Sequence, residues 1–171
     1  MLRPIVIALF LTALTAFGSV ADTITGIPRS GDGDTFKIAG TKIRIHGIDA
    51  PESTQQCKRA DGTCYACGTE STEHMQELIA GLRVTCALTG KRSYDRMIGV
   101  CSAGGNDLAV LMLQSGWAVA SRRYLGEVPG KRVPYLAAEQ EAERDKAGMW
   151  QGEFTMPWDW RRGRRSTGCG S

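Results

Sequence analysis

The chain has 171 residues, of which 23% are charged, and its formal net charge is +3. This length is enough for one domain with a buried core, and no shift in composition marks a second domain. A net charge this small does not by itself identify a class of binding partner.

The N-terminal stretch has the pattern of a signal peptide. Arg3 is followed by an apolar run over residues 5–17 and then by the small-residue ending S-V-A. This run is short for a membrane span, so we expect residues 1–21 to be cleaved off and the mature chain to begin at Asp22. The predicted location is secreted or periplasmic, with no membrane attachment after cleavage.

Export places the six cysteines in an oxidising compartment, where they are best explained as disulfide partners. Cys86 and Cys101 lie at equal distances from Ser93 and Tyr94, the expected tip of a hairpin. The two cysteines should therefore face each other across two antiparallel strands and form a disulfide.

The other four cysteines are less constrained by the sequence. We expect Cys57 to pair with Cys67 and to close a loop, which leaves the pairing of Cys64 and Cys169 open. A C-x-x-C pattern also occurs in zinc and redox sites, but no second C-x-x-C and no H-x-x-x-H accompanies it.

The first half of the mature chain has the features of short strands. Alternating or β-prone stretches separated by turn signals predict three strands in a meander, at residues 23–30, 35–38 and 42–48. Pro51 ends the third strand, because proline lacks an amide donor. Residues 53–68 are polar and predict a surface loop.

Helical and strand patterns then alternate. A helix is predicted over residues 69–82, where Met75, Leu78, Ile79 and Leu82 would lie on one face. Further along we expect strands at 83–88 and 97–102, a helix at 108–114 capped by Asn106 or Asp107, and a helix at 135–147.

This order predicts an α+β fold, a five-stranded OB-type β-barrel with about three α-helices. Such barrels include binders of oligonucleotides and sugars as well as enzymes, so the fold leaves the function open.

An acidic cluster between Asp32 and Glu52 points to a cation. Carboxylates in a small site repel one another unless a metal ion or a proton compensates, and carboxylate and carbonyl oxygens are the ligands of hard cations. Asp32 itself suits a tight turn beside glycine better than a ligand position.

Five motifs occur in register along the chain. They are D-G-D-T at residues 32–35, I-R-I-H-G-I-D-A-P-E at 43–52, Y-D-R at 94–96, G-W-A at 116–118 and A-x-x-x-K-A-G-M-W ending at Trp150. In this combination the sequence resembles the staphylococcal nuclease-like, or thermonuclease, family. The resemblance covers nearly all of the mature chain up to Trp150.

The resemblance implies a metal site and a catalytic set. Asp34 and Asp49 would bind one Ca²⁺ ion through their carboxylates and Ala50 through its carbonyl, although Mg²⁺ and Mn²⁺ also favour oxygen ligands. Glu52 would hold or deprotonate the attacking water. Arg44 and Arg96 would grip the scissile phosphate.

Two tyrosines, Tyr94 and Tyr124, are candidates for contacts with the bound nucleic acid. The family's commoner Y-G-R is here Y-D-R, and we expect the additional carboxylate of Asp95 to point outward from the hairpin turn.

The implied activity is a metal-dependent endonuclease, a phosphodiesterase that hydrolyses DNA and RNA with low sequence specificity and leaves products ending in a 3'-phosphate. The nuclease domain would span residues 22–155 of a monomer. Residues 156–171, hereafter the C-terminal tail, contain four arginines that would either meet an acidic polymer or simply be solvated. The alternatives are a catalytically inactive OB-type nucleic-acid-binding module and a disulfide-rich structural protein.

Overall fold

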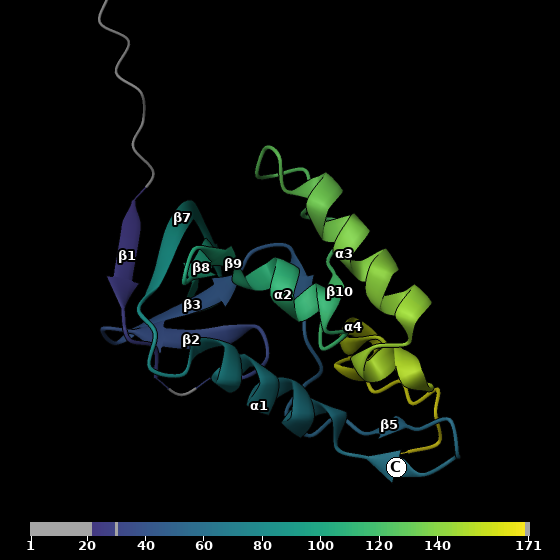
Figure 1. The fold of residues 1–171 in the computed structure, drawn as a ribbon. Helices are drawn as coiled ribbons and strands as arrows, with labels where there is room; N and C mark the ends of the chain where they lie inside the picture. The colour runs from purple at the N-terminus through teal and green to yellow at the C-terminus, as the bar shows by residue number, and fades with distance from the viewer. Residues whose placement is uncertain (1–21, 30, 170–171) are drawn as a thin grey trace, which may run out of the picture.

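The computed structural model describes residues 22–29 and 31–169, so the predicted signal peptide lies outside the described residues. Within this part of the chain, no helix has the length and apolar character needed to cross a membrane. The architecture is α+β, with a mixed sheet curled into a half-barrel of the OB type and helices around it (Figure 1).

Ten strands and four α-helices make up the described chain. The strands are β1 (Thr23–Gly26), β2 (Thr35–Ile38), β3 (Thr41–Ile45), β4 (Ile48–Asp49), β5 (Cys57–Lys58), β6 (Cys64–Tyr65), β7 (Val84–Ser93), β8 (Arg96–Ala103), β9 (Asn106–Asp107) and β10 (Val119–Ala120). The helices are α1 (Cys67–Ile79), α2 (Leu108–Gln114), α3 (Arg132–Asp145) and α4 (Pro157–Trp160), with a 3₁₀ turn, η1, at Gly148–Gln151.

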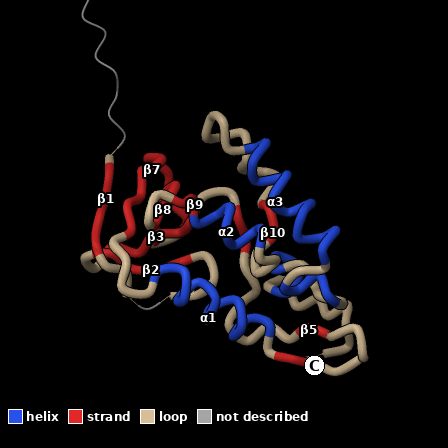
Figure 2. The backbone as a smooth tube through the Cα atoms, viewed as in Figure 1, coloured by secondary structure: helices blue, strands red, loops and turns tan. Residues whose placement is uncertain are grey.

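The main sheet has the strand order β1-β7-β8-β3-β2, with β9 paired to β8. All neighbours are antiparallel except β3 and β8, which run parallel. Two small sheets, β10-β4 and β5-β6, stand apart from it. In Figure 2 the strands of the main sheet gather on one side of the molecule, while α3, β10 and β5 lie on the other.

The predicted three-stranded meander is wrong in one respect. β2 and β3 do form a hairpin, whose two-residue turn has positive φ at both Ala39 and Gly40, as a right-twisted hairpin requires. β1, however, pairs with β7, whereas Arg29, at the end of the same predicted strand, forms an isolated antiparallel bridge with Lys37 of β2. This pairing was not predictable locally, because β1 and β7 are joined only by long-range contacts.

The β7–β8 hairpin carries the predicted pair of cysteines. Cys86 lies directly opposite Cys101, and the two form a disulfide. The turn is centred on Tyr94 and Asp95, one position later than predicted, because the register shifts between Leu88 and Arg92 on β7.

The core confirms the alternation that predicted the strands. Ile43 and Ile45 of β3 are buried, and they pack with Phe36 and Ile38 of β2 against the helices. Simple alternation along residues 42–48 would place His46 on the same face as Arg44, yet His46 is buried just after β3 ends.

The predicted helices exist: α2 covers the predicted residues 108–114, whereas the ends of α1 and α3 are shifted. α1 ends at Ile79, and Leu82, which was expected on its apolar face, lies beyond the helix and is 42% exposed. Asp107 is the residue that caps α2, and its carboxylate accepts hydrogen bonds from the amides of Ala109 and Val110.

Three disulfides join the described cysteines in pairs: Cys57–Cys67, Cys64–Cys169 and Cys86–Cys101. The first and third are the predicted pairs, and the second spans 105 residues of sequence. It ties the end of the C-terminal tail to β6, and in Figure 1 the C-terminus accordingly lies beside the β5 region.

Candidate active site

Two buried carboxylates form the centre of the site. Asp34 immediately precedes β2, and Asp49 ends β4, which is held in place by pairing with β10. Asp34 is 4% exposed and Asp49 is 3% exposed. Nη2 of Arg44, on β3, lies 2.8 Å from Oδ2 of Asp34 and 2.7 Å from Oδ1 of Asp49, so one guanidinium bridges both acids.

The D-G-D turn places Asp34 against the backbone of Ala50. A Cβ atom at Gly33 would lie 2.2 Å from Oγ of Ser71 and 2.7 Å from Cβ of Ala50, so only glycine permits this approach. The Ala50 amide donates a 3.4 Å hydrogen bond to Oδ2 of Asp34. Asp32, as predicted, acts in the turn, where its carboxylate accepts a hydrogen bond from the Asp34 amide.

The environment of Asp34 is short of positive charge. Burial, the largest cause, raises the pKa of Asp34 from 3.8 to about 6, and the carboxylates of Asp32 and Asp49 add to this effect. Arg44 and a hydrogen bond from Thr35 oppose it without cancelling it. A buried carboxylate whose charge is not compensated by its neighbours is suited to binding an additional cation.

The donors at this point fit a hard cation. Within residues 22–29 and 31–169, no three His, Cys, Asp or Glu side chains converge in a metal-binding cluster. The potential metal ligands are the carboxylates of Asp34 and Asp49 and the adjacent Ala50 backbone. A site with only oxygen ligands, completed by water, suits Ca²⁺, Mg²⁺ or Mn²⁺.

Arg96 lies at the start of β8, and β8 is adjacent to β3 in the sheet. Its guanidinium is held by neutral groups: Nη1 is 3.2 Å from Oγ1 of Thr35, and Nη2 is 3.3 Å from Oγ of Ser93. Thr35 in turn donates a 2.7 Å hydrogen bond to Oδ1 of Asp34. Arg96 is therefore positioned at the site with its positive charge not paired to a carboxylate by any of these bonds.

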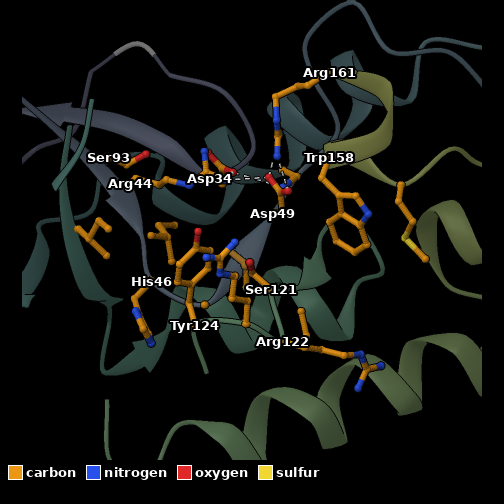
Figure 3. Close-up of a pocket in the computed structure, with 18 of the residues that line it drawn as sticks. Asp34, Arg44, His46, Asp49, Ser93, Ser121, Arg122, Tyr124, Trp158 and Arg161 are labelled. Carbon is orange, nitrogen blue, oxygen red and sulfur yellow. Dashed lines mark hydrogen bonds and ion pairs between the residues drawn. The ribbon is translucent and has the colours of Figure 1, made fainter. Parts of the chain in front are cut away.

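Glu52 follows the D-A-P turn, and its partner in the structure is Arg161 of the C-terminal tail. Nη1 of Arg161 lies 2.7 Å from Oε1 of Glu52 and 3.0 Å from Oδ1 of Asp49, while Nη2 lies 2.6 Å from Oδ2 of Asp49. In Figure 3 this guanidinium points at Asp49 from above, whereas Tyr124 and Ser121 lie below Asp49. The hydrogen bonds to Asp49 are the main reason that the pKa of Arg161 is raised.

These groups share one open cleft of about 900 Å³. Tyr94, Tyr124 and Trp158 line it together with the acids and arginines, and Tyr94 is 93% exposed and Tyr124 45% exposed. Exposed arginines also line the cleft, namely Arg92, Arg122, Arg123 and Arg162. A cleft with aromatic faces and a basic surround suits a polyanion that carries stackable rings.

The structure thus brings together every residue predicted for the site, namely Asp34, Arg44, Asp49, Ala50, Glu52, Tyr94, Arg96 and Tyr124. Asp95 is exposed and forms an ion pair with Lys42, in agreement with the predicted outward orientation. Sequence reasoning missed Arg161, Thr35 and Ser93. The D-G-D-T motif already contained Thr35, whereas no local pattern identifies Arg161.

A comparison with known protein families shows to which family the chain belongs. Residues 42–152 match the family described as "Staphylococcal nuclease homologue". The chain belongs to the staphylococcal nuclease family. The matched residues include Arg44, Asp49, Glu52 and Arg96, whereas Asp34 precedes them and Arg161 follows them.

Individual proteins are similar to this chain over most of its length. The succinoglycan biosynthesis protein ExoI of Rhizobium meliloti is 32% identical over 82% of this chain and 71% of its own length. An uncharacterized endonuclease of Escherichia coli O157:H7 is 31% identical over 82% of this chain and 86% of its own length. The probable staphylococcal-like nuclease CAN3 of Oryza sativa is 29% identical over 73% of this chain and 29% of its own length.

Proposed function

We propose that this protein is a secreted or periplasmic, calcium-dependent nuclease that hydrolyses the phosphodiester bonds of DNA and RNA with low sequence specificity. The observation that carries the proposal is the convergence of two buried carboxylates, Asp34 and Asp49, with the guanidinium groups of Arg44 and Arg96 in one cleft. Family relatives that are named endonucleases support hydrolytic nuclease activity.

Arg44 and Arg96 bind the scissile phosphate in this proposal. A phosphodiester under attack gains negative charge on its equatorial oxygens, and the planar guanidinium fork matches that charge with two hydrogen bonds in fixed geometry. Arg96 is suited to the task because its present partners are a threonine and a serine rather than a carboxylate. Binding of phosphate by Arg96 therefore does not require an ion pair to be broken.

Glu52 holds the attacking water and accepts its proton. The Glu52 side chain is 40% exposed to the cleft, so water has access to it. The Glu52 carbonyl accepts a 2.7 Å hydrogen bond from the Gln55 amide, which fixes the turn that carries this carboxylate. The water oxygen forms the new bond to phosphorus, the bond from phosphorus to the 5' oxygen breaks, and the 5' oxygen takes up a proton from solvent. The products are a 3'-phosphate and a 5'-hydroxyl.

Asp34, Asp49 and the Ala50 carbonyl would hold the Ca²⁺ ion. When bound, the ion supplies electrostatic stabilisation of the negative charge that develops on the phosphate oxygens. Mg²⁺ and Mn²⁺ are the alternatives to be compared in the assay.

The proposal also covers location and organisation. The mature protein begins at Asp22 after loss of residues 1–21, is a monomer without membrane attachment, and comprises a nuclease domain of residues 22–155 followed by the C-terminal tail. The signal-peptide pattern and the pairing of the described cysteines in three disulfides both favour an oxidising compartment.

The test is a hydrolysis assay of the purified mature protein on single-stranded DNA and on RNA, with calcium and with a chelator. We expect degradation of both substrates with calcium, none with the chelator, and a large loss of activity in Glu52→Gln. Glu153→Gln, at a solvent-exposed position outside the cleft, is the matched control. Nucleic-acid binding without any hydrolysis would instead support the inactive OB-type binding module.

A further inference from the structure

Arg161 occupies an unexpected position for a residue of the tail. It contacts both carboxylate oxygens of Asp49 and one oxygen of Glu52, at distances of 2.6 to 3.0 Å. Its side chain is 39% exposed, so the guanidinium lies at the mouth of the cleft rather than deep in the core. Arg161 also follows the residues that match the nuclease family, which end at residue 152.

The tail that carries Arg161 is anchored at both ends. Cys169 is 2% exposed and is bonded to Cys64, so the end of the tail is tied to β6. Trp160, which directly precedes Arg161, is 7% exposed, and the Arg165 guanidinium stacks 3.5 Å from the centre of its ring. The segment that carries Arg161 is therefore held near the cleft by a covalent bond and by packing, and not by the ion pairs of Arg161 alone.

A second set of contacts joins Thr155, the residue just before the tail, to the loop that carries Glu52. The side chain of Gln55 is fully buried, and its Nε2 donates a 2.6 Å hydrogen bond to the Thr155 carbonyl. Gln55 also donates its backbone amide to the Glu52 carbonyl. The Glu52 loop and the start of α4 thus form one unit, which holds Arg161 within reach of the acids.

Arg161 engages the same oxygens that a metal ion needs. Oδ1 of Asp49 accepts from Arg44 at 2.7 Å and from Arg161 at 3.0 Å, and Oδ2 accepts from Arg161 at 2.6 Å. A cation that approaches Asp49 must therefore displace Arg161 from at least one oxygen and must do so against its positive charge.

Arg162 and Arg164, two other arginines of the tail, pair with a different carboxylate. Arg162 lies 3.7 Å and Arg164 2.9 Å from the carboxylate of Asp159 on the tail itself, and the Arg164 side chain is 67% exposed. Contact with the central acids is thus specific to Arg161 among these neighbours.

We propose that Arg161 is a built-in competitor of the metal ion, a positioning residue that neutralises Asp49 and Glu52 until a divalent cation takes its place. The inference rests on the proposed metal site and deepens it, because it names what sets the affinity of that site. Arg161 lowers the affinity for the cation, so the nuclease is active only where the free calcium concentration is high enough to displace it.

The test is calorimetric titration of Ca²⁺ into the mature protein and its variants, without nucleic acid. We expect Arg161→Ala to bind Ca²⁺ about tenfold more tightly than the wild type, because a competing cation has been removed. Arg164→Ala removes the same charge from the same tail and should bind Ca²⁺ like the wild type. Asp34→Asn should abolish binding in either background, which assigns the measured heat to this site.

Thermal unfolding distinguishes competition from a merely structural role. Arg161→Ala should have a lower Tm than the wild type in chelator, because Asp49 and Glu52 lose their partner, and a larger rise in Tm on addition of Ca²⁺. Arg161→Gln, which keeps a polar side chain of similar size, should show the same larger rise. An equal rise in all proteins would contradict competition.

The outcomes separate this inference from the proposed function. Equal or weaker Ca²⁺ binding by Arg161→Ala, with binding that still depends on Asp34, would overturn only the competition. Absence of Ca²⁺ binding in every protein would overturn the metal site and the competition together.

Discussion

One wall of the cleft is formed by three neighbouring strands of the main sheet. Arg44 lies on β3 and Arg96 on β8, and Asp34 directly precedes β2. On another wall, Arg161 follows the four-residue helix α4 and meets a carboxylate that lies 109 residues earlier in the sequence. We call these the barrel wall and the tail wall. The first positions its charges by backbone pairing, and the second by a disulfide and by burial of Trp160.

The two ways of holding a side chain suit two different tasks in the cleft. Strand pairing fixes side chains rigidly, which suits groups that must match a transition state to within a fraction of an ångström. A segment held at its end by a covalent bond and by local packing can move slightly without unfolding the barrel, which suits a group that must give way to a cation. We therefore expect Arg44 and Arg96 of the barrel wall to control the rate, and Arg161 of the tail wall to set the calcium concentration that the enzyme requires.

The largest effect is expected from Arg96→Ala. The variant removes a fixed positive charge from the developing negative charge on the phosphate, so kcat should fall about 10²- to 10³-fold. The fold should be retained, because Arg96 is bonded only to Thr35 and Ser93 in the contacts described above. Steady-state hydrolysis of single-stranded DNA at saturating calcium measures this effect.

Two further variants in the same assay test whether the loss of kcat is specific to the barrel wall. Arg83→Ala removes an exposed arginine outside the cleft and should leave kcat unchanged. Arg161→Ala should keep kcat within about tenfold of the wild type, since at saturating calcium its competition no longer matters. A loss in Arg161→Ala as large as that in Arg96→Ala would remove the distinction between the walls.

The next effect concerns the anchor of the tail wall. Replacement of Cys64 and Cys169 by serine opens a loop of 105 residues, and removal of a native disulfide typically lowers the free energy of unfolding by about 2–4 kcal/mol. The tail should be released selectively, so limited trypsin digestion should cut after Arg161 to Arg165 much faster than in the wild type.

The Cys86–Cys101 disulfide provides the matched control for that experiment. Its removal from the β7–β8 hairpin should lower the stability of the barrel without exposing the tail to trypsin. Equal rates of tail cleavage in both double variants would show that the tail has no anchor of its own.

A smaller effect is expected in the pH dependence of stability. The pKa of Asp34 is raised from 3.8 to about 6, so between these values the folded protein holds a proton that the unfolded chain has lost. The metal-free protein should therefore lose stability as the pH rises through this window, by at most about 3 kcal/mol from this group. Asp34→Asn should lack this component.

Urea unfolding in chelator at pH 4, 5, 6 and 7 measures the difference. The stability of Asp34→Asn relative to the wild type should increase with pH over this range, whereas Asp61→Asn, at an exposed carboxylate, should show no such trend. A constant difference between Asp34→Asn and the wild type would mean that Asp34 is charged throughout.

The smallest effect is expected from Tyr94→Ala. The side chain is 93% exposed at the hairpin tip, so its removal should change the free energy of unfolding by less than about 0.5 kcal/mol. Loss of one stacked base should raise KM for single-stranded DNA about fivefold, at the low end of base-stacking energies. An unchanged KM would exclude a contact between Tyr94 and the substrate.

The sequence predicted the barrel wall well for a physical reason. The alternation of Ile43 and Ile45 fixes which face of β3 is buried, and that face determines where Arg44 points. In the D-G-D turn, the lack of a side chain at Gly33 permits the close approach to Ala50. These are local constraints, and a local pattern expresses them.

The sequence could not predict the tail wall or the place of β1. Contact between Arg161 and Asp49 depends on closure of the Cys64–Cys169 loop, and the sequence left that pairing open. Likewise, pairing of β1 with β7 rather than β2 is decided by the closure of the sheet, which four residues of alternating sequence do not specify. Both the Arg161–Asp49 contact and the β1–β7 pairing therefore depend on segments that are far apart in the sequence, which a local pattern does not reveal.

A crystal structure of the mature protein grown with calcium tests the metal site and its competition with Arg161 together. We predict one anomalous peak at Asp34, Asp49 and the Ala50 carbonyl, with Arg44 and Arg96 facing the cleft and with Arg161 withdrawn from at least one oxygen of Asp49. A calcium ion bound elsewhere, or none at all beside an intact pair of Arg161 and Asp49, would contradict the account.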